Sequence, residues 1–104
     1  MVTKQETKIV LKILDYIRHC GGDGWKVHGS ELQRAGEPDL DAWIPDPRGG
    51  HIHMKLEVKT PTGEPSPLQV HRINTYKRAG YLAEIVTSVD DLKEAINAYT
   101  QKPR

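Results

Sequence analysis

The sequence has only one cysteine, Cys20, and no apolar run of the length that a membrane span or a signal peptide requires. A lone cysteine excludes an internal disulfide and a zinc site built from several cysteines. It also suits a reducing compartment, so we expect a cytoplasmic protein, in a bacterial cell or in a phage-infected host. Internal repeats are absent, and the only low-complexity stretch is the short polar segment 101–104.

The chain also lacks an excess of charge of either sign. Fifteen Lys and Arg residues against 14 Asp and Glu residues leave a net charge of +1, without a global basic field. Any contact with nucleic acid must therefore come from local basic patches. With 104 residues, of which 37% are hydrophobic, we expect one compact domain that spans residues 1–104 and has a modest core.

The segment 36–59 carries the residues of greatest chemical interest. Residues 51–59 alternate between polar and apolar side chains, and this period of two is typical of a half-buried strand. Residues 40–44 are also strand-like, and the intervening segment 45–50 is rich in proline and glycine. The pattern predicts a β-hairpin.

The hairpin brings acidic residues together. For any turn centred between Pro47 and Gly50, Asp39 falls opposite a residue between Leu56 and Thr60. Asp39 should then lie beside Glu57 and Lys59, which share a strand face about 6.5–7 Å apart.

Two carboxylates about 4–5 Å apart repel by roughly 4 kcal/mol at an effective dielectric near 20, so such a pair favours a hard divalent cation. Two alternatives remain open. The charges on this face can be ordinary cross-strand pairs in solvent, and Asp41 can replace Asp39 in a shifted register.

These residues carry a resemblance to a known family. Gly36-x-Pro38-Asp39, Glu57-x-Lys59 and Ser66-x-x-Gln69, in this order, resemble the pattern of the PD-(D/E)xK nuclease superfamily, and more specifically that of the virus-type replication-repair nuclease (VRR-NUC) domain. The similarity extends through Gly80 and the strand and helix that follow it, and so covers nearly the whole chain.

The resemblance implies a restriction-endonuclease-like α/β fold and metal-dependent hydrolysis of DNA. Asp39 and Glu57 would bind Mg²⁺ or Mn²⁺, with the backbone carbonyl of Val58 as a further ligand. Lys59 would orient the attacking water or offset the charge on phosphorus.

The first helix is predicted over residues 3–20, where an apolar stripe follows helical spacing and is ended by the glycines that begin at Gly21. Glu6 lines up with Val10, Ile13 and Ile17 on that stripe. It is either an acid in the first turn that favours the helix dipole, or, as the resemblance implies, an acid that completes the metal site.

Ser66, Pro67 and Gln69 form the start of a helix, with the pattern of a capping box. Gln69 therefore has a structural explanation, whereas the resemblance implies that it faces the active site and helps to hold the water or the phosphate. It lines up with Ile73 and Tyr76 on the inward stripe.

The remaining elements complete the order α-β-β-β-α-β-α. A short strand is expected at 25–28, and a strand at 81–87 should lie parallel to the one at 51–59 because a helix connects them. Residues 88–91 open a last helix, whose buried face is predicted to contain Leu92, Ala95, Ile96 and Tyr99. We expect a mixed sheet with helices on both faces.

Basic residues that could contact DNA phosphates are scattered over several elements, and each can equally be plain surface. They are Lys26, His28, Arg34, His71, Lys77 and Arg78. His51 and His53 share a strand face and could bind a transition metal, but further zinc ligands are not evident.

The leading interpretation is a Mg²⁺- or Mn²⁺-dependent endonuclease. Its substrate would be branched DNA, with Holliday-junction resolution by a homodimer, because free-standing members of the family that it resembles act in this way and a twofold dimer presents two centres to opposing strands. Leu11, on the polar side of the first helix, is a weak sign of such a contact. The alternatives are a non-catalytic nucleic-acid-binding module with the same fold and a nonspecific DNA nuclease.

Overall fold

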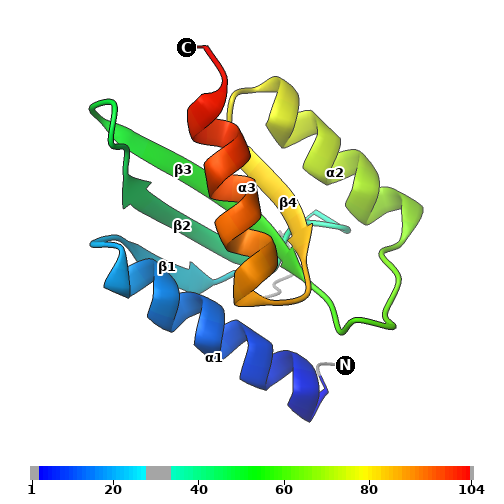
Figure 1. The fold of residues 1–104 in the computed structure, drawn as a ribbon. Helices are drawn as coiled ribbons and strands as arrows, with labels where there is room; N and C mark the ends of the chain where they lie inside the picture. Colours follow the sequence, from blue (N-terminus) through cyan, green and yellow to red (C-terminus); the bar gives the residue numbers. More distant parts are fainter. Residues whose placement is uncertain (1–2, 28–33, 104) are drawn as a thin grey trace.

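The computed structural model describes residues 3–27 and 34–103. Its elements follow the predicted order, and their bounds are α1 (Lys4–His19), β1 (Asp23–Lys26), β2 (Leu40–Pro45), β3 (His51–Val58), α2 (Pro67–Arg78), β4 (Leu82–Val86) and α3 (Val89–Gln101). The four strands form one mixed sheet in the order β1-β2-β3-β4 (Figure 1). The β1–β2 and β2–β3 pairs are antiparallel, and the β3–β4 pair is parallel as expected for strands joined through α2.

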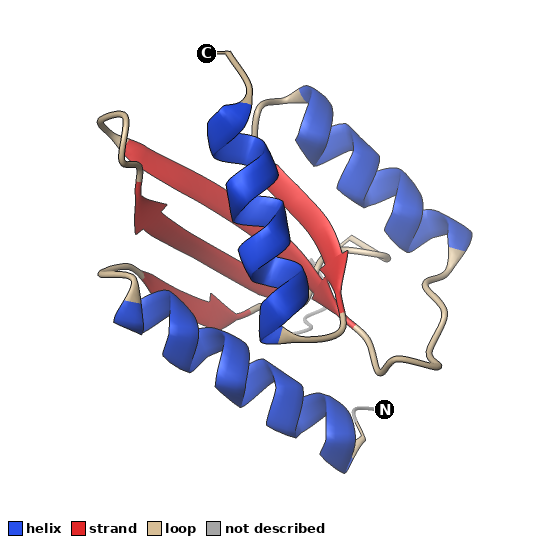
Figure 2. Ribbon diagram, in the orientation of Figure 1, coloured by secondary structure: helices blue, strands red, loops and turns tan. Residues whose placement is uncertain are grey.

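The helices cover both faces of the sheet. Helices α1 and α3 lie in front of the strands in the view of Figure 2, and α2 lies beyond β4. The main core forms between α1, α3 and the sheet, where the alternate residues Leu40, Ile52, Leu56 and others are fully buried. Helix α2 contacts β3 and β4, and it makes no comparable contact with β1 or β2. Gln69 of α2 contacts Glu57, whose side chain alternates with those of the core residues Leu56 and Val58, so α2 packs on the other face of the sheet, toward its β4 edge.

Helix α1 is amphipathic, as the spacing predicts. Val10, Ile13, Leu14 and Ile17 are buried in the core, and the helix begins after the N-cap Thr3, whose hydroxyl accepts a hydrogen bond of 3.0 Å from the Glu6 amide. Truncation of a side chain as buried as Ile13 or Ile17 to alanine typically costs about 2–5 kcal/mol of stability.

The first strand begins earlier than the predicted 25–28, because two glycines interpreted as part of the helix stop pack closely against the sheet. A Cβ on Gly24 would lie 3.0 Å from the Ala42 side chain and 3.1 Å from Leu14. Gly22 approaches the backbone of Trp43 and Ile44 even more closely. These glycines let the chain turn directly from α1 into β1.

The predicted hairpin is formed by β2 and β3. Its turn is held by Asp46, whose carboxylate accepts hydrogen bonds from the backbone and the side chain of Arg48. The last helix buries Leu92, and Ala95, Ile96 and Tyr99 pack against the core, so the predicted face of α3 is confirmed. Among the helices of residues 3–27 and 34–103, none has the length and apolar character needed to cross a membrane.

Candidate metal centre

The register of the hairpin sets two carboxylates side by side. Leu40 pairs with Leu56, and one further step along both strands puts Asp39 opposite Glu57, within the predicted range. The chain already follows the sheet at this point, because the Val27 amide donates a 2.8 Å hydrogen bond to the Asp39 carbonyl. The Asp39 side chain crosses to β3, where Oδ2 accepts a 2.9 Å hydrogen bond from the Val58 amide.

Glu57 is buried, with only 2% of the residue exposed. Its Oε2 atom lies 3.6 Å from Lys59 Nζ and accepts a 3.3 Å hydrogen bond from Gln69 Nε2. The other oxygen, Oε1, is buried and has no hydrogen-bond partner among the described residues. A buried carboxylate oxygen without a donor is costly, so this atom is a natural ligand for a cation.

The electrostatics of the pair point in the same direction. Burial, and next to it the neighbouring Asp39 carboxylate, raise the pKa of Glu57 to about 8, and the Lys59 ammonium offsets only part of this increase. Two acids that oppose each other's ionisation are stabilised together when a positive charge lies between them.

This donor set fits a hard divalent cation. Mg²⁺ uses one or two carboxylates and keeps several waters, so Asp39 and Glu57 are sufficient protein ligands. In the part of the chain that the structure describes, no group of three His, Cys, Asp or Glu side chains is arranged to hold a metal ion. The remaining ligands would come from water, a backbone carbonyl such as that of Val58, or the substrate.

Gln69 forms the capping box that the sequence predicts, and its side chain also contacts the acid pair. Its Oε1 accepts a 2.8 Å hydrogen bond from the Ser66 amide, and its own amide donates to Ser66 Oγ at 3.1 Å, which is the capping box. The remaining side-chain group, Nε2, donates to Glu57. The capping box thus fixes the side-chain amide of Gln69, which in turn orients the Glu57 carboxylate.

The Asp41 carboxylate is engaged in an ion pair with Lys55. No sequence motif marks Lys55, whose Nζ lies 2.8 Å from Asp41 Oδ1 and whose side chain is largely buried. Although burial favours the neutral amine, the Asp41 carboxylate raises the pKa of Lys55. The register that pairs Asp41 with Lys55 is the one that puts Asp39, and not Asp41, opposite Glu57.

Among the described residues, Glu6 does not form a group of three metal ligands with Asp39 and Glu57. Leu56 and Val58 face the core that α1 covers, and Glu57 points to the opposite face, where α2 supplies Gln69. Glu6 is half-buried in the first turn of α1, where an acid favours the helix dipole. Helical spacing places Glu6 on the inward stripe, but the spacing does not reveal which face of the sheet the helix covers.

Three of the candidate DNA contacts lie on α2, and Lys26 lies on β1. Lys26 and His71 are exposed, Lys77 Nζ lies 3.2 Å from Glu84 Oε1, and Arg78 donates a 3.3 Å hydrogen bond to the Thr75 hydroxyl.

The other candidates are Arg34 and His28, proposed as DNA contacts, and the histidine pair His51 and His53, considered as metal ligands. Arg34 lies 2.7 Å from the Glu37 carboxylate. His28 is outside the described residues. His51 packs edge-on against the Trp43 ring, and neither His51 nor His53 belongs to a metal-binding cluster in the described residues.

The fold is a small α/β domain with a mixed four-stranded sheet, and an acidic pair and a lysine lie where its two central strands meet. Its fold is that of the VRR_NUC domain. One solved structure, titled "VRR_NUC domain", matches this chain with 24% sequence identity and a TM-score of 0.73. The match covers 93% of this chain and 99% of that one. A second, titled "VRR_NUC domain protein", matches with 19% sequence identity and a TM-score of 0.62, and the match covers 95% of this chain and 90% of that one. No protein-family model and no curated protein matches the sequence.

Proposed function

We propose that this protein is a divalent-metal-dependent endonuclease that hydrolyses phosphodiester bonds of DNA, with branched DNA as its substrate. The observation that carries the proposal is the buried Glu57 carboxylate, which has an unpartnered oxygen, beside Asp39 and within ion-pair distance of Lys59. The fold, which the chain has in common with VRR_NUC domains, is consistent with this assignment.

The acid pair would hold the metal ion, and Gln69 would keep Glu57 in position. Asp39, Glu57 and the Val58 carbonyl would hold Mg²⁺ or Mn²⁺, which supplies Lewis-acid polarisation of the phosphoryl oxygen. Gln69 keeps Oε2 of Glu57 engaged, so that Oε1 remains free to act as a ligand.

Lys59 is the one cationic side chain that lies within ion-pair distance of Glu57 among the described residues. Its ammonium would orient the attacking water, or offset the negative charge that builds up on phosphorus before the ester bond breaks. An ammonium with 18% of its side chain exposed is shielded from bulk water, which strengthens either effect.

The basic residues of α2 would hold the DNA backbone. This helix contains His71, Arg72, Lys77 and Arg78 and no acidic residue, and its Gln69 contacts the acid pair. A phosphate chain that follows α2, with Lys26 and Arg34 as further contacts, would lead to Glu57. A homodimer would present two centres to the two strands of a junction. Leu11, with 61% of the residue exposed on α1, would lie in the contact between its subunits.

The test is incubation of the purified protein with a four-way junction, a flap and a linear duplex, each in Mg²⁺, in Mn²⁺ and in EDTA. The expected result is cleavage of the junction that requires the metal and is lost in Lys59→Ala but not in a matched surface variant, Lys12→Ala. DNA binding in EDTA without cleavage in either metal would indicate a non-catalytic binding module. Equal cleavage of all three substrates would indicate a nonspecific nuclease.

A further inference from the structure

Asp39 lies at the end of a short segment that must be held in place for the acid pair to form. This segment, residues 34–39, precedes β2, and its side chains and backbone are attached to α2. Arg72 Nε, on α2, donates a 3.2 Å hydrogen bond to the Ala35 carbonyl. The segment is therefore bound to a helix more than thirty residues away in the chain.

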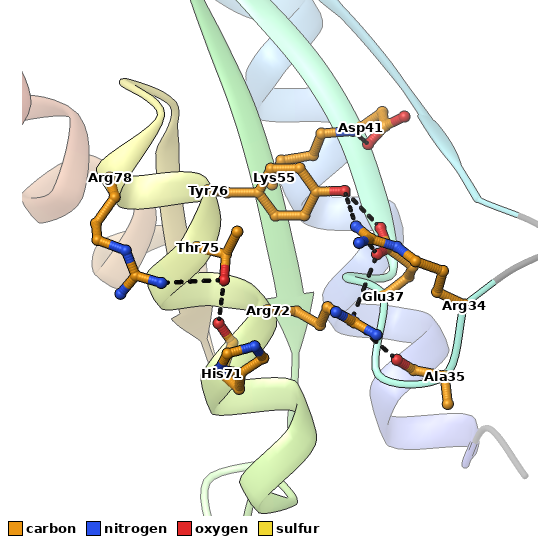
Figure 3. Close-up of polar contacts among 10 residues, drawn as sticks. All are labelled: Arg34, Ala35, Glu37, Asp41, Lys55, His71, Arg72, Thr75, Tyr76 and Arg78. Carbon is orange, nitrogen blue, oxygen red and sulfur yellow. Dashed lines mark hydrogen bonds and ion pairs between the residues drawn. The ribbon is translucent and has the colours of Figure 1, made fainter.

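Glu37, two residues before Asp39, makes the strongest of these attachments. Its Oε2 accepts a 2.6 Å hydrogen bond from the Tyr76 hydroxyl, and its Oε1 lies 2.7 Å from Arg34 Nη2 and 3.8 Å from Arg72 Nε. Figure 3 shows the three partners converging on this carboxylate from the loop and from α2. Only 14% of the Glu37 side chain is exposed, and the hydrogen bond that its carboxylate accepts from Tyr76 is charge-assisted, a kind that is among the stronger ones in proteins.

Gly36 brings the segment against the helix backbone. It has a φ of +79°, and a Cβ at this position would lie 2.7 Å from Leu68 Cγ and 3.1 Å from the Leu68 carbonyl oxygen. The segment thus contacts three residues of α2 at intervals of four, Leu68, Arg72 and Tyr76, which lie along one side of a helix.

The same helix contacts the other acid. Gln69, next to Leu68, donates to Glu57 Oε2. Tyr76 makes a cation–π contact with Lys55, whose Nζ lies 4.9 Å from the ring centroid. The same Nζ donates a hydrogen bond to Asp41. One helix therefore touches both the segment that carries Asp39 and the carboxylate of Glu57.

We propose that Glu37, Arg72 and Tyr76 are positioning residues, which fix Asp39 relative to Glu57 by binding the 34–39 segment to α2. The consequence for metal binding rests on the function proposed above, whereas the mechanical coupling between Tyr76 and Asp39 does not. Loosening the attachment lets Asp39 move away from Glu57, so cation affinity and turnover fall. Residues that orient metal ligands typically change affinity or activity by about 10–100-fold.

The test compares Tyr76→Phe with Tyr99→Phe. Each removes one hydroxyl that donates a hydrogen bond, at 2.6 Å to Glu37 and at 2.7 Å to the Gly80 carbonyl respectively, and each keeps its ring. Glu37→Gln is a second variant, which retains an acceptor for Tyr76 but loses the charge that attracts the two arginines.

Two readouts separate the coupling from the chemistry. The first is hydrogen exchange of the Val58 amide in EDTA, because this amide donates to Asp39 Oδ2 and reports its position without metal. The second is Mn²⁺ affinity, measured together with kcat and with KM for DNA.

Tyr76→Phe is expected to speed Val58 exchange about tenfold or more, and to weaken Mn²⁺ binding and lower kcat by about tenfold. Tyr99→Phe should leave all of these at the wild-type values, and Glu37→Gln should change them in the same direction as Tyr76→Phe. Val58 exchange that is unchanged in Tyr76→Phe, or that rises equally in both tyrosine variants, would overturn the proposal. If wild-type protein bound no Mn²⁺, the proposed function would fail, and the Val58 readout would still decide the coupling.

Discussion

Replacement of Glu57 by glutamine should change how the stability of the metal-free protein depends on pH. Burial and the Asp39 carboxylate raise the pKa of Glu57 in the folded protein from an ordinary 4.5 to about 8. Between these two values the folded state holds a proton that the unfolded state has released. The free energy of unfolding therefore falls as the pH rises through this window, and the loss is complete above pH 8.

The magnitude follows from the width of the window. Each unit of pKa difference is worth about 1.4 kcal/mol, so a window of roughly 3.5 units corresponds to about 3–5 kcal/mol. This is a large part of the roughly 5–15 kcal/mol that stabilises a typical domain. Glutamine has nearly the same shape and never ionises, so Glu57→Gln should not show this loss.

The assay is urea denaturation in EDTA at several pH values between 5 and 9. The difference between the wild type and Glu57→Gln cancels the titration of all other groups, and it should grow in favour of the variant as the pH rises. Parallel stability curves for the two proteins would refute the reasoning, because they would mean that Glu57 ionises without hindrance. A saturating divalent cation should remove most of the difference, since it binds the ionised form.

Three further substitutions test separate parts of the account. Lys59→Ala should abolish cleavage of a four-way junction and leave Mn²⁺ affinity, measured by calorimetry, within about threefold of the wild type; wild-type turnover would remove this lysine from the mechanism. Gly36→Ala should lower the free energy of unfolding in urea by about 1–3 kcal/mol, because φ is +79° and Leu68 fills the space; an unchanged midpoint would contradict the close contact. Glu6→Gln should leave Mn²⁺ affinity within about twofold, because α1 covers the opposite face of the sheet, whereas a large loss would restore this acid to the ligand set.

The hairpin and its acid pair could be predicted from the sequence because both depend on local rules. Strict alternation over residues 51–59 determines which side chains share a face, and the length of the turn limits the register to a few positions. Any register in that range brings Asp39 close to Glu57 or Lys59. The capping pattern at Ser66 likewise located the start of α2 at the correct residue.

Features that depend on contacts between distant segments could not be predicted in this way. In the sequence, Gly22 and Gly24 follow the first helix and resemble a signal that ends it. Only the packed structure reveals that they let the backbone of β1 and of the turn before it approach β2 closely. Glu37 occupies a variable position of the Gly-x-Pro-Asp pattern, and its partner Tyr76 is far away in the chain. Which face of the sheet α1 covers, and hence the place of Glu6, is also decided by the tertiary fold.

The central claim is that Asp39 and Glu57 together bind a hard divalent cation. The most direct measurement is a titration of Mn²⁺ into wild-type protein and into Asp39→Asn at pH 8.5, followed by the electron paramagnetic resonance signal of the free ion. The wild type is expected to deplete this signal stoichiometrically, and Asp39→Asn is expected to leave it nearly unchanged. Equal depletion by both proteins, or none by the wild type, would contradict the claim.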